Sequence, residues 1–331
     1  MRFPLFILIL CCGILVACSS GDPKFPLEET LTQELMPLQG ISNPGRIEVC
    51  HPFLIICNGQ RSDSLFHIYD LTNYELKSAF GVQGRGPGEF VNPWLFKTPL
   101  SEILIGDSNN NYLVSRFGID QDGQPIFKEA KQPNYIMGAA NAAFINDSLY
   151  VIDAMYLAPS LYLLTFQDEL PRKTRQFRNP NMIDFFSDPD MGWVFANDSR
   201  IALCYGWKKQ IDFMDIDLNL IKRVKFKFDG PTIITSKNEE DVNMSYISGY
   251  FGKHYLYALF LGVARKEDTP SYRGGILEVY DLDGSPVARY HFDGIKPGNF
   301  VVDEETFVLY GTGGSSGVID NLLVYKLKGL S

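Results

Sequence analysis

The stretch LFHIYDLTNYELKSAFGVQGRGPGEFVNP, from Leu65 to Pro93, decides the fold. Its first half contains two strand-like apolar runs joined by a polar turn, and its second half is a glycine-rich connector. Diverged copies of the first half recur along the chain at intervals of about 50 residues, a period typical of propeller blades. The recurrence therefore predicts a repeat architecture.

Two kinds of strand carry the repetition. One is a buried strand after a polar turn, represented by FLIIC, EILIG, LYVID, RIALC, YLYAL and FVLYG. The other is a strand that ends in an acidic turn, at Asp70, Asp120, Asp168, Asp217 and Asp283, with a last copy, NLLVYKLKG, that carries Lys326 instead. Asn, Asp and Gly favour tight reversals between strands, so each repeat is expected to hold about four strands.

These repeats predict an all-β fold, a six-bladed β-propeller with four-stranded blades. The last repeat ends at its third strand, whereas LTQELMPL, Leu31 to Leu38, stands alone before the first repeat. We expect this N-terminal strand to complete the sixth blade and to cover an otherwise open edge. Longer spacing in the fifth repeat predicts an exposed insertion from Gly262 to Gly275.

The N-terminus resembles a bacterial lipoprotein signal peptide. A short basic start and an apolar run lead to Leu15-Val16-Ala17-Cys18, the pattern that is cut before the cysteine. The resemblance implies three segments: a signal peptide over residues 1–17, a tether over 18–30 that is lipidated at Cys18, and one propeller domain over 31–331. The chain is then held on a membrane by its lipid.

Composition excludes some partners. The formal net charge of -9 argues against nucleic acid, because phosphate binding needs a clustered basic surface. The basic run KRVKFKF, Lys222 to Phe228, is interpreted as a solvated edge strand. Cys50, Cys57 and Cys204 lie in apolar runs and are interpreted as buried thiols, with a Cys50–Cys57 disulfide as the alternative.

The connector GVQGRGPGEFVNP, Gly81 to Pro93, resembles the GxGxGPGxFxxP connector of NHL-type propellers. With the lipobox and six diverged repeats, the whole chain resembles the TolB-like six-bladed propeller lipoproteins of Bacteroidetes. The resemblance implies a place in the cell envelope of a Gram-negative bacterium. The residues after Cys18 lack an aspartate at the second position, which favours the outer membrane.

Propellers bind ligands on one face, around the central channel, so residues in the connecting loops are the candidates for partner binding. They are Arg46, Arg85, Trp193, Trp207, Tyr246 and Arg273. Glycines on both sides of Arg85 could aim its guanidinium at a carboxylate or phosphate. The alternative is structural, with Arg85 and Glu89 fixing the blade junction while Phe90 fills the core.

We hypothesise a non-enzymatic binding or scaffold protein whose partner is a protein, a peptide or a glycan, since aromatic residues anchor recognition surfaces. The alternative is a metal-assisted hydrolase or lyase that uses acids such as Asp107, Asp153 or Asp184 at the channel. The four histidines are scattered without metal-ligand spacing, and no cofactor motif is present, so neither a metal nor a cofactor is expected.

Overall fold

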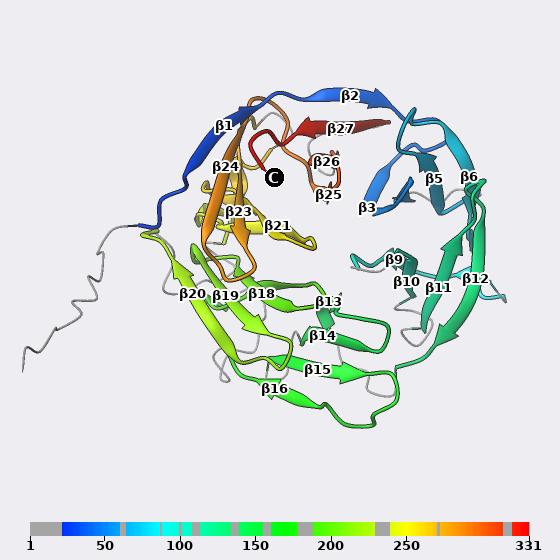
Figure 1. The fold of residues 1–331 in the computed structure, drawn as a ribbon, viewed down its shortest axis with the longest axis horizontal. Helices are drawn as coiled ribbons and strands as arrows, with labels where there is room; N and C mark the ends of the chain where they lie inside the picture. The colour runs from blue at the N-terminus through cyan, green and yellow to red at the C-terminus, as the bar shows by residue number, and fades with distance from the viewer. Residues whose placement is uncertain are drawn as a thin grey trace, which may run out of the picture.

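The computed structural model describes residues 22–59, 64–86, 88–98, 101–107, 113–133, 139–154, 160–177, 188–228, 239–269, 272–313 and 320–330. These residues form six sheets of four antiparallel strands in a ring around a central axis, and one sheet carries a fifth strand (Figure 1). The fold is a six-bladed β-propeller, which confirms the prediction from the repeats. Cys18 and the expected signal peptide lie outside the described residues.

The blades follow one another along the chain, and each runs from its innermost strand to its outermost strand. Blade one contains β3 (Pro44–Cys50), β4 (Phe53–Asn58), β5 (Phe66–Asp70) and β6 (Leu76–Phe80). Blade two contains β9 (Pro93–Leu95), β10 (Ile103–Asp107), β11 (Leu113–Ile119) and β12 (Pro125–Lys131). Blade three contains β13 (Ala139–Phe144), β14 (Leu149–Ala154), β15 (Leu161–Thr165) and β16 (Lys173–Arg175).

The second half of the ring repeats this plan. Blade four contains β17 (Gly192–Ala196), β18 (Arg200–Tyr205), β19 (Gln210–Asp215) and β20 (Leu220–Lys225). Blade five contains β21 (Tyr246–Phe251), β22 (Tyr255–Phe260), β23 (Ile276–Asp281) and β24 (Pro286–Phe292). Blade six contains β25 (Asn299–Asp303), β26 (Val308–Thr312) and β27 (Asn321–Lys326) from the C-terminal part of the chain.

The two repeated sequence tracks are the second and third strands of the blades. Every residue of β4, β14 and β15 is buried, because these central strands have a neighbouring strand on each side and a neighbouring blade on each face. The outermost strand β20 is exposed at all positions but Val224. The interpretation of the basic run at Lys222 as a solvated edge is therefore confirmed.

In the acidic turns after β19 and β23, the aspartate that ends the third strand holds the turn by accepting hydrogen bonds from its backbone amides. The Oδ1 atom of Asp215 accepts hydrogen bonds from the amides of Asp217 and Asn219. Asp281 does the same for Asp283 and Ser285. Asp217 and Asp283, the acids that marked these turns in the sequence, lie in the turns themselves, two residues after the aspartate that accepts the amides.

The glycine-rich connector forms a small structure of its own. Val82–Gln83 (β7) and Glu89–Phe90 (β8) pair in parallel. The carboxylate of Glu89 accepts the amide of Gly86 at 2.7 Å, and a side chain at Gly84 would collide with that carboxylate. The glycines therefore leave space for Glu89, which confirms a structural role of this junction. Phe90 packs edge-on against Phe66, at 5.5 Å between ring centroids.

The N-terminal segment closes the ring by pairing with two blades (Figure 1). Glu34–Pro37 (β2) pairs antiparallel with β27 and completes blade six, as predicted. Leu27–Leu31 (β1) pairs in parallel with β24 and adds a fifth strand to blade five. The sequence pattern predicted a tether over residues 18–30 and one strand over residues 31–38, so β1 was not predicted.

The insertion falls where the spacing predicted it, between β22 and β23 of blade five. It contains the short helix η2 (Arg265–Glu267), which packs against η1 (Glu239–Asp241) from the connector between blades four and five. Lys266 pairs with Asp241 at 2.6 Å, and the backbone of Met244 bonds that of Val263 and Gly262. The insertion is thereby fixed to the neighbouring connector.

Candidate binding site at the central channel

The innermost strands of the six blades enclose a cavity of about 220 Å³ on the axis of the ring. All six blades contribute to its wall. The described lining residues are Arg46, Leu95, Lys97, Thr98, Ala142, Ala143, Trp193, Val194, Phe195, Ala196, Ile247, Ser248, Phe251, Gly298 and Asn299.

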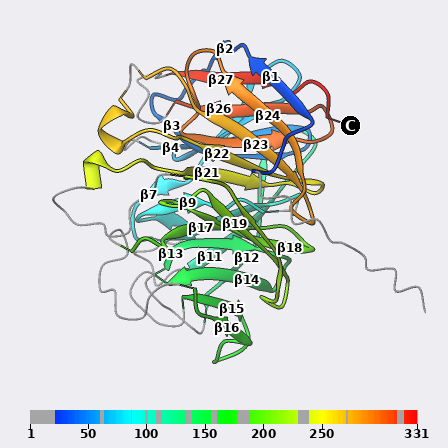
Figure 2. The same cartoon turned by 90° about the vertical axis from the view of Figure 1, so that its left-hand side faces the viewer.

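The topology orients this cavity. Each innermost strand follows a connector between blades, so all six start at the same face of the ring, here called the connector face. Figure 2 shows β7 and the two short helices on one side of the molecule and the C-terminus on the other. Arg46, Trp193 and Asn299 stand early in their strands and therefore lie near the connector face. Lys97 follows the end of β9 and lies deeper.

Arg46 presents its side chain to the cavity. The residue is exposed, although β3 is otherwise mostly buried. Its Nη1 atom donates one long hydrogen bond, 3.4 Å, to the carbonyl oxygen of Leu95. Protein around the channel removes part of the hydration of the guanidinium and lowers the pKa of Arg46. Arginine nevertheless stays charged in proteins, so the cavity wall carries a fixed cation.

Lys97 crosses the channel from blade two to the opposite blade. Its Nζ atom donates to the carbonyl oxygen of Gly249 at 2.5 Å and lies 4.9 Å from the ring centroid of Phe300. Burial lowers the pKa of Lys97, and the nearby carboxyl of Glu48 opposes this shift. Lys97 is thus engaged within the fold and narrows the deep end of the channel.

Glu48, on β3, is buried next to this crossing, with 1% of its area exposed. Burial raises the pKa of its carboxyl, and the charge of Lys97 partly opposes the shift. The two groups share one poorly hydrated site, where an ionised carboxylate is disfavoured. Glu48 does not appear among the residues that line the cavity.

An apolar cluster stands beside the connector end of the channel. Buried Met191 and Trp207 pack with the partly buried side chains of Trp193, Val242 and Met244. Trp193 belongs both to this cluster and to the cavity wall. The cluster therefore supports one aromatic wall of the cavity from behind.

The structure separates the sequence-predicted binding residues into three groups. Arg46 and Trp193 meet at the channel. Arg85 and Arg273 are exposed on the connector face, away from the cavity wall. Trp207 and Tyr246 are buried, with 1% and 0% of their area exposed, so they cannot contact a partner in this conformation. Sequence reasoning mistook these two core aromatics for surface ones.

Lys97 was missed as a channel residue because nothing in its local sequence, PWLFKTP, distinguishes it from a solvated lysine. Asn299 and Ser248 were missed for the same reason. Only the ring topology, which brings six separate strands to one axis, reveals them.

Of the acids considered for catalysis, the structure describes Asp107 and Asp153. Asp107 accepts the backbone amides of Val91 and Asn92 at 2.7 and 2.9 Å, so it fixes the start of blade two. Asp153 is fully buried on β14. Asp184 lies outside the described residues. Within the part of the chain that the structure describes, no group of three or more His, Cys, Asp or Glu side chains could hold a metal ion.

Another buried acid, Glu278 on β23, is surrounded by partners at the seam between blades four and five. Its Oε1 atom lies 2.8 Å from Nζ of Lys209 and 3.2 Å from Nη2 of Arg289. Its Oε2 atom accepts the hydroxyls of Tyr246 and Tyr280, both at 2.7 Å. A buried network of charged side chains therefore holds this seam together. Glu278 lies inside that network and offers no surface to a partner.

The N-terminal segment covers this network. The guanidinium carbon of Arg289 lies 4.3 Å from the ring centroid of Phe25, and Glu28 pairs with Arg289 at 3.1 Å. Phe25 also packs edge-on against Tyr280 at 5.5 Å. The segment from Phe25 to Leu31 therefore seals the seam and also adds β1 to blade five.

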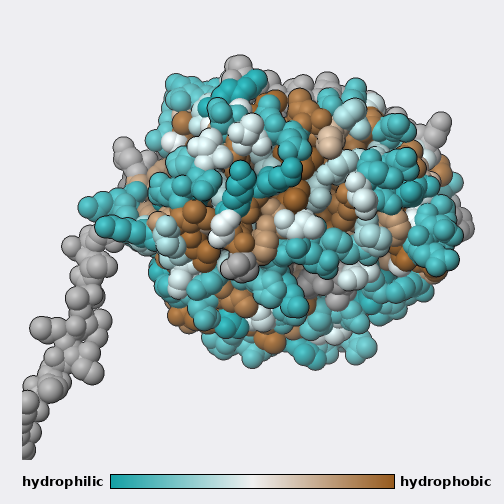
Figure 3. Space-filling model, turned by 45° about the horizontal axis from the view of Figure 1, so that its top comes forward, coloured by the Kyte–Doolittle hydropathy of each residue, from teal (hydrophilic) through white to brown (hydrophobic). Residues whose placement is uncertain are grey.

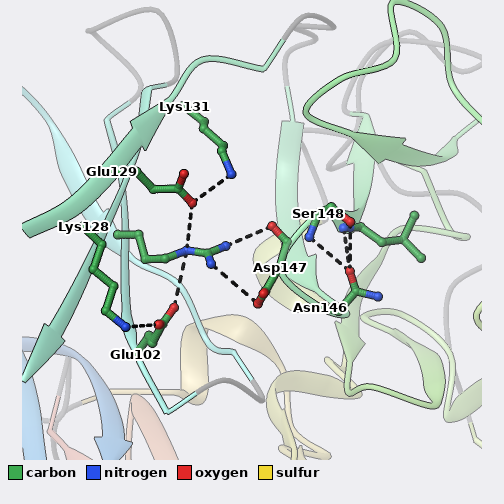
Figure 4. Close-up of polar contacts among 9 residues, drawn as sticks. Glu102, Lys128, Glu129, Lys131, Asn146, Asp147 and Ser148 are labelled. Carbon is green, nitrogen blue, oxygen red and sulfur yellow. Dashed lines mark hydrogen bonds and ion pairs between the residues drawn. The ribbon is translucent and has the colours of Figure 1, made fainter.

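The seam between blades two and three carries a more exposed network (Figure 4). The guanidinium of Arg116 on β11 lies 3.4 Å from Glu102, 3.5 Å from Glu129 and 3.6 Å from Asp147, the last from blade three. Asp147 sits in a turn where Asn146 accepts the amides of Ser148 and Leu149. This network joins two blades at the surface.

Apolar side chains on the outer surface are dispersed. Figure 3 shows hydrophilic residues interspersed with smaller hydrophobic areas over the visible face. The exposed large hydrophobic residues stand mainly on outer strands and connectors: Leu35, Val82, Ile126, Phe127, Leu170, Leu220 and Ile221. The channel is thus the better defined candidate site.

The fold and the channel define a class, the six-bladed propellers with an enclosed axial cavity. The sequence matches the family described as TolB-like 6-blade propeller-like over residues 24–305, and the chain belongs to this family. No curated protein matches. Among the described residues, no helix is long and apolar enough to cross a membrane.

Two solved structures resemble this fold. One is a putative exported protein from Bacteroides fragilis, with a TM-score of 0.57 and 11% identity, covering 90% of this chain and 98% of that chain. The other is a member of the DUF4221 family from Bacteroides vulgatus, with a TM-score of 0.56 and 14% identity, covering 90% and 96%. At such identities the likeness extends to the fold alone.

Proposed function

We propose that this protein is a lipid-anchored binding protein of the bacterial cell envelope that recognises its partner at the connector face without catalysing a reaction. The observation that carries the proposal is the asymmetry of the two faces. The connector face holds the insertion of blade five, the exposed Arg85 and Arg273, and the cavity mouth with Arg46 and Trp193. A partner that is a protein, a peptide or a glycan would meet a polar surface with an aromatic wall.

The envelope location rests on the sequence Leu15 to Cys18 and on the exported protein of similar fold. Lipid attached to Cys18 would hold the propeller on a membrane, and the absence of an aspartate directly after Cys18 favours the outer membrane. Fractionation of cells that express the full chain tests this. The Cys18→Ser variant is expected to leave the membrane fraction, and an unchanged membrane fraction would overturn the lipid anchor.

Site-specific photo-crosslinking on whole cells tests the binding face. A crosslinking amino acid at Arg273 is expected to capture a partner. The same amino acid at Glu305, whose side chain is 76% exposed in a turn on the opposite face, is the matched control. Capture at Glu305 and none at Arg273 would assign binding to the other face and overturn the proposal.

A further inference from the structure

The charged residues that line the channel cavity are both cations. Among the described lining residues, only Arg46 and Lys97 carry a charge. Glu48 is buried beside Lys97, and burial disfavours the charged forms of both side chains, so this pair adds no net charge to the wall. Inside a narrow, partly dehydrated channel, the potential of the Arg46 guanidinium is screened less than at an open surface. The cavity is therefore suited to an anion.

Arg46 has no acid beside it, unlike several other arginines among the described residues. Arg116, Arg223 and Arg289 each lie within 4 Å of at least one carboxylate. Arg46 makes no such ion pair with any described residue, and its one hydrogen bond is long. A guanidinium has five donors in a planar fork that matches a carboxylate, so most of the capacity of Arg46 is directed at the cavity.

Lys97 is not available to a ligand in the same way as Arg46. Its amine is held by the carbonyl of Gly249 and by the ring of Phe300. An anion that enters from the connector face reaches Arg46 first, because Arg46 lies nearer that end of the strands.

The rest of the connector-side wall supplies complementary groups. Trp193 provides an aromatic surface, supported from behind by Met191. Ser248 and Asn299, both half-buried, contribute hydroxyl and amide groups from blades five and six. A cavity of about 220 Å³ is smaller than the usual site for a drug-sized molecule and has room for one small ring.

We propose that the channel cavity, entered from the connector face, binds a small carboxylate-bearing sugar of hexuronate size. The carboxylate pairs with Arg46, the apolar face of the ring lies on Trp193, and the hydroxyls bond to Ser248 and Asn299. This inference rests on the proposed binding function, because it specifies the ligand class for the same face.

Titration calorimetry of the full chain with D-glucuronate tests the proposal, with D-glucose and inorganic phosphate as comparison ligands. Glucuronate is expected to bind, and glucose to bind at least about tenfold more weakly, since it lacks the charge-assisted hydrogen bonds to Arg46. Arg46→Met is expected to weaken glucuronate binding by about tenfold or more. Lys253→Met, which removes an equal charge from the exposed turn between β21 and β22 on the opposite face, should leave it within about twofold.

Thermal unfolding of each variant shows whether it is folded. If Arg46→Met does not fold, Arg46→Lys keeps the charge without the fork and should bind glucuronate detectably but more weakly. Absence of glucuronate binding, equal binding of glucose, preferential binding of phosphate, or equal losses in Arg46→Met and Lys253→Met would each overturn the proposal. Capture at Arg273 without glucuronate binding would overturn the ligand class alone and leave the proposed function standing.

Discussion

Two charged side chains of this propeller, each on a strand, differ in their surroundings. Glu278 sits at the seam between blades four and five, with two cations and two tyrosine hydroxyls around its carboxylate. Arg46 sits at the channel, with one long hydrogen bond to a carbonyl and no described carboxylate within ion-pair distance. The carboxylate of Glu278 is fully paired within the fold, whereas the guanidinium of Arg46 faces a cavity.

The difference separates charges that hold the propeller together from charges available for a ligand. Removing a partner from a buried, engaged group leaves uncompensated charges and destabilises the fold. Removing a group that faces an open cavity affects folding little and affects the ligand strongly. The predictions below follow this division, from the largest expected change in the free energy of unfolding to the smallest.

The largest loss is expected for Glu278→Gln. This variant leaves Lys209 and Arg289 without their buried carboxylate, and breaking such a pair costs about 3–5 kcal/mol. Chemical denaturation monitored by tyrosine fluorescence or circular dichroism measures the change. Glu29→Gln on the exposed side of β1 is the control and should stay within about 0.5 kcal/mol of the wild type. Equal stability of Glu278→Gln and the wild type would show that the network is not a structural element.

A somewhat smaller loss is expected for Phe25→Ala, which uncovers the same seam. Phe25 is 8% exposed and packs on Phe226, Tyr280 and Arg289, so truncation should cost about 3 kcal/mol. Lys24→Ala, at an exposed neighbouring position, is the control for the same measurement. A loss no larger than that of Lys24→Ala would mean that the segment before β1 does not seal the propeller.

The fold was predictable from this sequence because propeller blades repeat. Buried strands such as FLIIC and RIALC recur at a near-constant spacing, and the turn residues Asn146 and Asn197 repeat with them. The strand β1 could not be found in this way, because LEETL has exposed acids at its centre and is held by pairing with a distant strand. Its partner, β24, lies about 260 residues later, and no local pattern encodes that contact.

The candidate site was only partly predictable. Arg46 and Trp193 were found because they stand next to connectors, which propellers place around the channel. Trp207 stands in an equally plausible loop, but packing against Met191 buries it. Lys97 was missed because its role depends on Gly249 and Phe300 from the opposite side of the ring.

A pH-dependent effect is expected for Glu48→Gln. The pKa of Glu48 is raised in the folded state, so the folded protein retains a proton that the unfolded chain releases. The free energy of unfolding contributed by this group therefore falls as pH rises from about 5 to about 8. Relative to the wild type, Glu48→Gln should become progressively more stable over this window, whereas the exposed Glu75→Gln should show no such trend. A difference that is independent of pH would contradict the burial argument.

A small loss is expected for Arg116→Met at the seam between blades two and three. Its partners are partly or largely exposed, so solvent and salt weaken the network to about 1 kcal/mol or less. The loss should shrink further when denaturation is repeated at high salt. If Arg116→Met lowered the free energy of unfolding as much as Glu278→Gln, solvent exposure would not explain a difference between the seam of blades two and three and the seam of blades four and five.

The most direct test compares Arg46→Met and Glu278→Gln in the same two assays, chemical denaturation and calorimetric titration with D-glucuronate. Arg46→Met should keep the free energy of unfolding within about 0.5 kcal/mol of the wild type and lose glucuronate binding by about tenfold or more. Glu278→Gln should lose stability and, under conditions where it stays folded, bind glucuronate as the wild type does. Destabilisation of Arg46→Met with unchanged glucuronate binding would contradict the assignment of Arg46 to a ligand.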